Sequence, residues 1–152
     1  MEPAAPMTQP SIIAERLSCV RGDRMLFAGL SLRLSGGEAL QLTGPNGVGK
    51  SSLMRILAGL LRPLSGDIRR EGQTALLDER HALEAHLPLG RALDFWARCD
   101  RVPADRMAEV ARATGVADLL DVPVRYLSTG QRKRAALART IAGHAPIWLL
   151  DE

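Results

Sequence analysis

Eight consecutive residues match the pattern G-x-x-x-x-G-K-[ST] at every position. They are Gly44, Pro45, Asn46, Gly47, Val48, Gly49, Lys50 and Ser51. Glycines at these spacings let the backbone curl so that successive N–H groups point at a phosphate, and a helix beginning at Lys50 adds the positive end of its dipole. Lys50 can reach the terminal phosphates, the Ser51 hydroxyl can bind Mg²⁺, and Ser52 follows in the first helical turn. The sequence therefore predicts a site for a nucleoside triphosphate with Mg²⁺, because an ordinary glycine-rich turn would not need the complete pattern.

The last two residues are adjacent carboxylates, Asp151 and Glu152, and they follow four apolar residues at 147–150. A buried strand that ends in carboxylates downstream of a phosphate loop is typical of sites that hydrolyse nucleotides. In such a site Asp151 would hold Mg²⁺ through water, and Glu152 would orient or deprotonate the attacking water. We therefore predict Glu152 and Lys50 as catalytic residues. The alternative is that the carboxylates are the exposed end of an ordinary strand.

A third segment, at residues 127–131, has the sequence Leu-Ser-Thr-Gly-Gln. The spacing of Ser128 and Gln131 is that of a capping box, which predicts a helix that begins at this serine and runs to Gly143. The Ser128 hydroxyl and the Gly130 amide would then lie at a helix N-terminus, where an anion binds well. A plain capped helix would account for Ser128 and Gln131, but not for all three segments occurring together.

The order of apolar and turn residues predicts an α/β fold with a strand-rich N-terminal part. Apolar alternation predicts strands at 12–17 and 30–34, and apolar runs predict strands at 39–43 and 147–150. Two more short strands are predicted at 67–70 and 74–77. Helical spacing predicts helices at 50–61, 89–99, 104–114, 116–120 and 128–143. We therefore predict one domain over residues 11–152, with a helical subdomain inserted at 79–143. A disordered, proline-containing leader is predicted at 1–10.

The composition argues against several classes of function. The 152 residues suffice for one domain with a sizeable core. The net charge is only +3, and Lys and Arg are spread along the chain, which argues against nucleic acid as a partner. Cys19 and Cys99 form no metal or redox motif, and no apolar stretch is long enough to cross a membrane. A role at a membrane would therefore require a partner.

Together the three segments resemble those of the ABC family of transport ATPases, whose signature is usually LSGGQ; here Thr129 replaces the first glycine. The resemblance implies a P-loop NTPase core that binds ATP and Mg²⁺ and pairs head to tail with a second ATP-binding domain. In such a dimer the signature of one chain contacts the ATP held by the other. The signature residues of this chain are Ser128, Thr129, Gly130 and Gln131.

Residues 17–22, 24–27, 37–47 and 57–63 also resemble the ATP-binding subunits of cytochrome c-type heme exporters. This resemblance implies a motor subunit at the cytoplasmic face of the bacterial inner membrane, bound peripherally to multispanning membrane subunits of a heme exporter. Such a subunit would export heme, or drive heme release, for cytochrome c maturation. Two alternatives remain open: an ABC ATPase for another cargo, and a nucleotide-binding module with little hydrolysis.

The sequence departs from the family in three places. Where many members stack an aromatic residue on adenine, this chain has Val20 or Arg21, so Arg21 either covers the base or is a solvated turn residue. The glutamine expected before the helical insertion is replaced by residues 78–81, in which Glu79 or His81 either acts as a ligand or is solvated. The family also continues beyond the carboxylates to a histidine at the γ-phosphate. We therefore expect a fold that is incomplete at its C-terminus, and slow hydrolysis by this chain alone.

Overall fold

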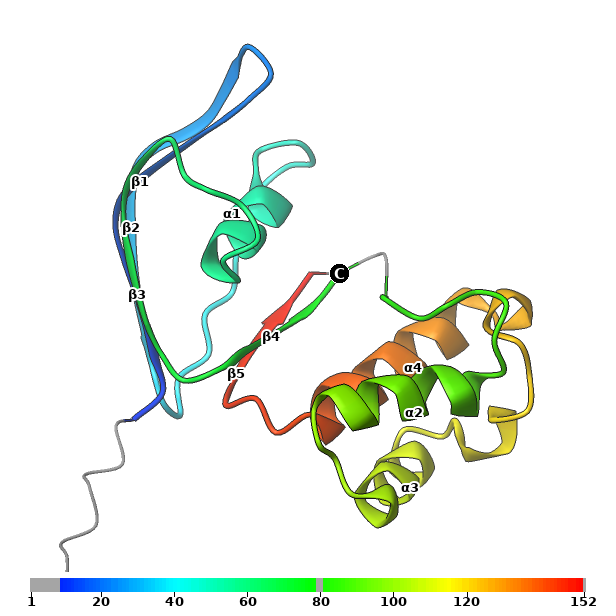
Figure 1. Cartoon of the computed structure of the whole chain (residues 1–152). Coiled ribbons are helices and arrows are strands. Elements are labelled where there is room, and N and C mark those ends of the chain that lie inside the picture. Colours follow the sequence, from blue (N-terminus) through cyan, green and yellow to red (C-terminus); the bar gives the residue numbers. More distant parts are fainter. Residues whose placement is uncertain (1–8, 79–80, 152) are drawn as a thin grey trace, which may run out of the picture. The chain divides into compact units, whose positions relative to one another are not determined.

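A computed structural model describes residues 9–78 and 81–151 of the chain. These residues form two compact units, the first comprising residues up to 76 together with 146–151, and the second comprising residues 77–145 (Figure 1). Most of the leader predicted at 1–10 lies outside the described residues, as do Glu79, Arg80 and the predicted catalytic Glu152. Each unit has its own hydrophobic core.

The first unit contains an antiparallel sheet with the strand order β2-β1-β3. The strands are β1 (Ser11–Arg21), β2 (Arg24–Ser35) and β3 (Ser65–Glu71). All three are longer than the predicted segments at 12–17, 30–34 and 67–70. The register of β1 shifts against both neighbours after residues 14 and 15, and Arg16 has a φ of 51°. Such irregularities interrupt the period-two alternation from which the strand lengths were predicted.

Helix α1 (Lys50–Leu57) covers one face of this sheet and buries Leu53, Ile56 and Leu57. It ends four residues before the predicted position. The reason is a local hydrogen-bonding pattern: Gly59 has a φ of 80°, its amide donates to Ile56, and the Leu60 amide donates to Arg55. This pair of bonds is a Schellman motif, which ends a helix at a glycine regardless of the apolar spacing that follows it.

A separate two-stranded sheet pairs β4 (Thr74–Leu77) with β5 (Ile147–Leu150), and both strands have the predicted bounds. The apolar run at 147–150 predicts a buried strand, and this prediction is wrong for half of β5. Ile147 and Leu149 are buried, whereas Trp148 and Leu150 are 46% and 49% exposed. The strand is therefore covered on one face only.

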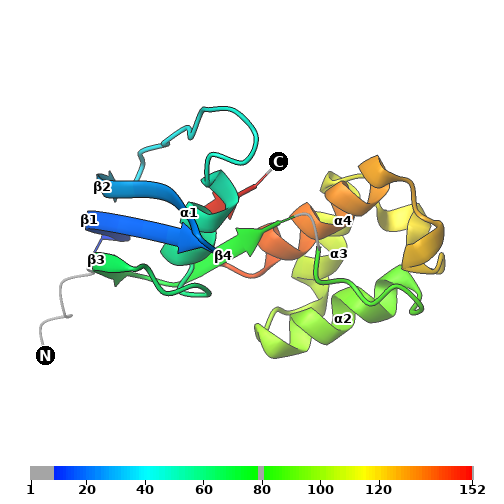
Figure 2. The same ribbon diagram turned by 90° about the horizontal axis from the view of Figure 1, so that it is seen from above.

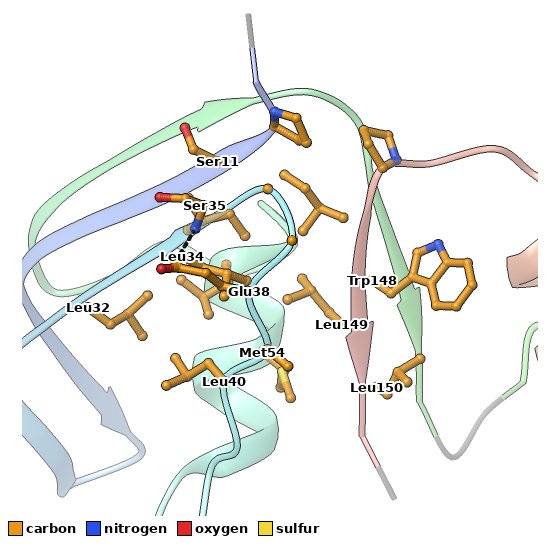
Figure 3. Close-up of a pocket in the computed structure, with 18 of the residues that line it drawn as sticks. Ser11, Leu32, Leu34, Ser35, Glu38, Leu40, Met54, Trp148, Leu149 and Leu150 are labelled. Carbon is orange, nitrogen blue, oxygen red and sulfur yellow. Dashed lines mark hydrogen bonds between the residues drawn. The ribbon is translucent and has the colours of Figure 1, made fainter.

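The strand predicted at 39–43, which would lead into the phosphate loop, is also wrong. Within the described residues this segment has no regular secondary structure and no strand pairs with it. Its apolar side chains instead face a cavity of about 400 Å³ that Leu40, Met54 and Leu149 help to line (Figure 3). A neighbouring strand would supply both the hydrogen bonds and the apolar contacts that this segment lacks.

The second unit is helical (Figure 2). It contains α2 (Leu89–Cys99), α3 (Ala104–Ala113) and α4 (Thr129–Ala142), with short 3₁₀ turns at η1 (Ala117–Leu119) and η2 (Val124–Tyr126). Helix α2 has the predicted bounds, and the helix predicted at 116–120 is only a 3₁₀ turn. The small side chains of Ala135, Ala138 and Ala142 are fully buried, which allows the other helices to approach α4 closely. No helix within residues 9–78 and 81–151 is long and apolar enough to span a bilayer.

The turn into β3 gives a test of the fold. Gly66 has a φ of 93°, and a Cβ atom added there would lie 2.5 Å from the carbonyl oxygens of Glu15 and Arg16. We expect Gly66→Ala to lower the free energy of unfolding by about 2–4 kcal/mol, because backbone strain and a backbone clash add. Gly29→Ala is the matched control, since Gly29 has a φ of 68° but open space around it, and it should cost only about 1 kcal/mol. Urea denaturation would measure both, and equal losses would contradict the clash.

Candidate functional site

The phosphate loop, residues 44–51, runs into the start of α1 and packs against β2. Gly49 is the N-cap residue of α1 and has a φ of 113°. A Cβ atom at Gly49 would lie 3.1 Å from Leu26 Cβ and 3.2 Å from Phe27 Cδ1. Only glycine combines this backbone conformation with so close an approach to the strand. The position of the helix N-terminus is therefore set by its contact with β2.

The N-terminus of α1 presents unused hydrogen-bond donors. Within the described residues, no side chain caps this end, and the first turn contains no acidic residue. The amides of the first turn, which includes Ser51 and Ser52, have no acceptors within the helix itself. Residues 44–48 and Ser51 are also exposed. This end of the helix therefore fits a phosphate group in both its hydrogen bonding and its dipole.

The ammonium group of Lys50 lies across the loop. Its Nζ donates hydrogen bonds to the carbonyl oxygens of Gly44 at 2.7 Å and Pro45 at 3.2 Å. The positive charge is thus held over the residues predicted to surround the phosphates. A phosphate oxygen would be a stronger acceptor than either carbonyl, because both partners would then be charged.

The β1–β2 hairpin lies beside the loop through the same contact with Gly49. Arg21 is exposed at the end of this hairpin, opposite Arg24 in the strand register. The next pair in the ladder is Val20 and Met25, and Met25 is 51% exposed. Sequence reasoning singled out Val20 and Arg21 but missed Met25. The sequence feature that could have pointed to Met25 is a large apolar residue two positions after the turn at residues 22 and 23. The end of the hairpin thus carries both a planar guanidinium and a flexible apolar side chain, and Leu26, the residue after Met25, contacts the loop at Gly49.

Asp151 is half-buried directly after β5, in the same unit as the phosphate loop and Ser51. The second predicted carboxylate, Glu152, lies outside the described residues. Among residues 9–78 and 81–151, no three His, Cys, Asp or Glu side chains converge as a metal-binding group. In nucleotide sites Mg²⁺ is usually held by one or two protein groups together with phosphate oxygens and water, so it needs no such cluster.

The signature segment, residues 127–131, lies in the helical unit, whereas the phosphate loop lies in the other one. The predicted capping box is present: the Gln131 amide donates to Ser128 Oγ at 3.2 Å, and the Ser128 amide donates to Gln131 Oε1 at 2.8 Å. Leu127 is buried beneath it, while Ser128, Thr129 and Gly130 are exposed. Within the described part of the chain, nothing lies within 4 Å of a Cβ atom built on Gly130. The start of α4 is therefore both ordered and accessible.

The segment that replaces the expected glutamine is connected to α4 through an aromatic residue. His81 and Ala82 have positive φ values of 53° and 50°, which is unusual for side chains larger than glycine. Trp96 Nε1 donates to the Ala82 carbonyl at 2.6 Å, and the Arg139 guanidinium carbon lies 3.4 Å from the centroid of the Trp96 ring. Burial lowers the pKa of Arg139, and the charge of Asp100 opposes this effect. Trp96 thus joins residue 82 to the helix that carries the signature.

A family model described as ABC transporter matches residues 27–152. The chain belongs to the ABC transporter family. It is 59% identical over 146 residues to the cytochrome c biogenesis ATP-binding export protein CcmA of Novosphingobium aromaticivorans, a match that covers 96% of this chain and 74% of the relative. The protein with the same description from Sphingopyxis alaskensis is 56% identical over 136 residues, covering 90% of this chain and 70% of the relative.

A solved structure supports the ABC fold. The structure of a bacterial Atm1-family ABC exporter with ATP bound superimposes with a TM-score of 0.83 at 24% sequence identity. The match covers 99% of this chain and 30% of the exporter chain. At this identity the likeness concerns the fold, and it agrees with the predicted P-loop α/β core and inserted helices.

The capping box allows the structural contribution of Ser128 to be measured separately. We expect Ser128→Ala to destabilise the protein by about 1 kcal/mol, because the Gln131 amide loses its acceptor. Ser128→Asp should cost much less, because aspartate is an equally good N-cap and its charge suits the helix dipole. Thermal unfolding followed by circular dichroism would compare the two variants. Unchanged stability of Ser128→Ala would mean that the cap does not stabilise α4.

Proposed function

We propose that this chain is the ATP-binding and ATP-hydrolysing subunit of an ABC transporter that exports heme, or drives heme release, for cytochrome c maturation. The observation that carries the proposal is the 59% identity to a cytochrome c biogenesis ATP-binding export protein over 96% of this chain. The exposed phosphate loop at the start of α1 supports the same reading at the level of chemistry.

In this proposal the loop residues bind the phosphates of ATP. The backbone amides of residues 46–52 and the Lys50 ammonium would neutralise the phosphate charge, and Arg21 would cover the base. Ser51 and Asp151 would hold Mg²⁺, which when bound neutralises charge on the β- and γ-phosphate oxygens. Glu152 would accept a proton from the attacking water. In this arrangement hydrogen-bond donors and cations contact the anionic phosphates, and the carboxylates contact the metal ion and water.

The proposed active form is a head-to-tail pair with a second ATP-binding domain. Each chain carries one phosphate loop in its first unit and one exposed signature N-terminus in its second. The Ser128 hydroxyl and the amide of Gly130 are suited to the γ-phosphate held by the other chain. Residues 128–131 would therefore complete the partner's site. Nucleic acid is not proposed as a partner.

The membrane partners in this proposal are multispanning subunits of a heme exporter, with the chain bound peripherally at the cytoplasmic face of the bacterial inner membrane. A transporter for another cargo would use the same nucleotide site, because none of the proposed motor residues contacts cargo. The third possibility is a nucleotide-binding module with little hydrolysis. Capture of the membrane subunits, together with loss of mature cytochrome c in a deletion strain, would separate heme export from the other two.

The nucleotide site can be tested with two substitutions. Lys50→Met should weaken ATP binding about 10- to 100-fold, because a hydrogen-bonded charge contact to phosphate is lost. Glu152→Gln should preserve ATP binding but lower turnover about 10²- to 10⁴-fold, the usual contribution of a general base. Lys133→Met is the matched control, because Lys133 is exposed on α4 and outside the loop. Titration calorimetry and phosphate release would measure the two effects, and unchanged affinity in Lys50→Met would refute the proposed contact.

The shared site predicts a different outcome for the signature. Ser128→Asp retains an N-cap but places a carboxylate at the proposed γ-phosphate position, so ATP-driven dimerisation should be lost while the monomer stays folded. Gly130→Ala has room in the monomer and should raise helix stability, yet it should also impair dimerisation by crowding the partner's nucleotide. Light scattering with ATP in the Glu152→Gln background would report the dimer. Normal dimerisation of both variants would argue against a shared site.

A further inference from the structure

Two arginines face each other at the tip of the β1–β2 hairpin, and the proposed nucleotide chemistry uses only Arg21. Arg21 is the last residue of β1, Arg24 is the first residue of β2, and the two are direct partners in the strand register. The turn between them consists of Gly22, which has a φ of 59°, and Asp23. A two-residue turn with glycine in this conformation fixes the register of a hairpin. The two arginine side chains therefore start only about 5 Å apart.

This pair of like charges is unfavourable in the chain without a ligand, because like charges directly opposite each other destabilise a sheet. Both arginines are exposed, and neither side chain forms a hydrogen bond or an ion pair with residues 9–78 or 81–151. Asp23, which lies in the turn between them, forms no ion pair with either arginine. A hydrogen-bond acceptor placed beside the two guanidinium groups would use their free donors and offset the repulsion.

The arginine pair lies on the face of the hairpin that packs against α1. Cys19 and Phe27 are also direct partners in the register, and both belong to the core that α1 covers. Because side chains alternate along a strand, Cys19 and Arg21 project from the same face, and Arg24 shares the face of its partner. Phe27 Cδ1 lies 3.2 Å from a Cβ atom built on Gly49. The face that carries the arginines is therefore the face that contacts the phosphate loop.

The direction of α1 places the arginine pair beyond the start of this helix. The start of α1 contacts β2 close to the hairpin tip, whereas its last carbonyls accept hydrogen bonds from Arg70, the partner of Ile12 at the far end of β1. Figure 1 draws the hairpin tip and the phosphate loop at the same end of the first unit. Arg24 is two residues from Leu26, which corresponds to about 7 Å of strand. A nucleotide whose phosphates occupy the loop is therefore within reach of both guanidinium groups.

The chemistry of a guanidinium group distinguishes between the two purine bases. Its N–H groups are all donors, and it has no acceptor. The edge of guanine presents two acceptors, O6 and N7, which an arginine can contact with two parallel hydrogen bonds. The same edge of adenine presents the acceptor N7 beside the N6 amino group, which is a donor and cannot bond to a second donor. If Arg21 covers the face of the base, an arginine at its edge therefore favours guanine.

We propose that Arg24 contacts the edge of the base that Arg21 covers, and that the site therefore binds GTP as well as ATP, with the higher affinity for GTP. The inference rests on the proposed function, because it takes the phosphates of the nucleotide to lie in residues 44–51. It adds to that function a residue that determines base specificity and a second nucleotide. The contacts of Lys50 and Ser51 are the same for both nucleotides, because the triphosphate is identical.

Calorimetric titration of the chain with MgATP and with MgGTP tests the proposal. We expect the wild type to bind GTP about tenfold more tightly than ATP, the effect of one pair of base-specific hydrogen bonds. Arg24→Gln should reverse this preference, because a glutamine amide donates to N7 of adenine and accepts from its N6 amino group. Arg21→Ala should weaken both nucleotides equally, because stacking does not distinguish the bases. Arg33→Gln is the control, since Arg33 is exposed on β2 far from the hairpin tip and should change neither affinity.

The same titrations separate the inference from the proposed function. Wild-type protein that binds ATP as tightly as GTP, or more tightly, would overturn the inference and leave the proposed function intact. Equal weakening of both nucleotides by Arg24→Gln would mean that Arg24 contacts phosphate and not the base, which would also overturn it. Wild-type protein that binds neither nucleotide would contradict the proposed function, and the inference would fail with it. Retained ATP binding by Arg24→Gln shows at the same time that this variant is folded.

Discussion

The contact between the start of α1 and strand β2 is the constraint on which the phosphate loop depends. Gly49 approaches Leu26 and Phe27 so closely that a side chain would meet both, and its backbone has a φ of 113°. The other end of α1 is held as well, because the Arg70 side chain donates to the carbonyls of Leu57 at 2.6 Å and Ile56 at 2.8 Å. Because both ends of the helix contact the sheet, its orientation is fixed, and the free amides of its first turn remain available to a ligand.

The two units divide the proposed chemistry between them. The phosphate loop, Lys50 and Asp151 belong to the first unit, and the signature belongs to the second. Each half is complete as local structure: the loop opens a helix, and the signature is a fully formed capping box. Under the proposed function, ATP joins the loop of one chain to the signature of another.

Several elements could be predicted from the sequence because their causes are local. Helix α2 and the strands β4 and β5 have the predicted bounds, and the capping box follows from the spacing of Ser128 and Gln131. Two predictions were wrong because they depended on tertiary contacts or on individual hydrogen bonds that apolar spacing does not reveal. Apolar residues at 39–43 predicted a strand, but a strand also needs a neighbour, and these residues face a cavity instead. The apolar spacing continued to residue 61, while the hydrogen bonds around Gly59 ended α1 earlier.

The chemistry proposed for this protein could be predicted from the sequence, because the phosphate loop, the signature and the two carboxylates are short motifs of adjacent residues. The tertiary structure determined which residues those motifs contact and which faces remain exposed. It placed β2 against Gly49, turned Lys50 onto the loop carbonyls, and left Trp148 and Leu150 on an uncovered face. It also brought His81, Arg125 and Arg132 to one pocket. No spacing rule relates residues that far apart, because their proximity comes from the packing of whole segments and not from the local geometry of the backbone.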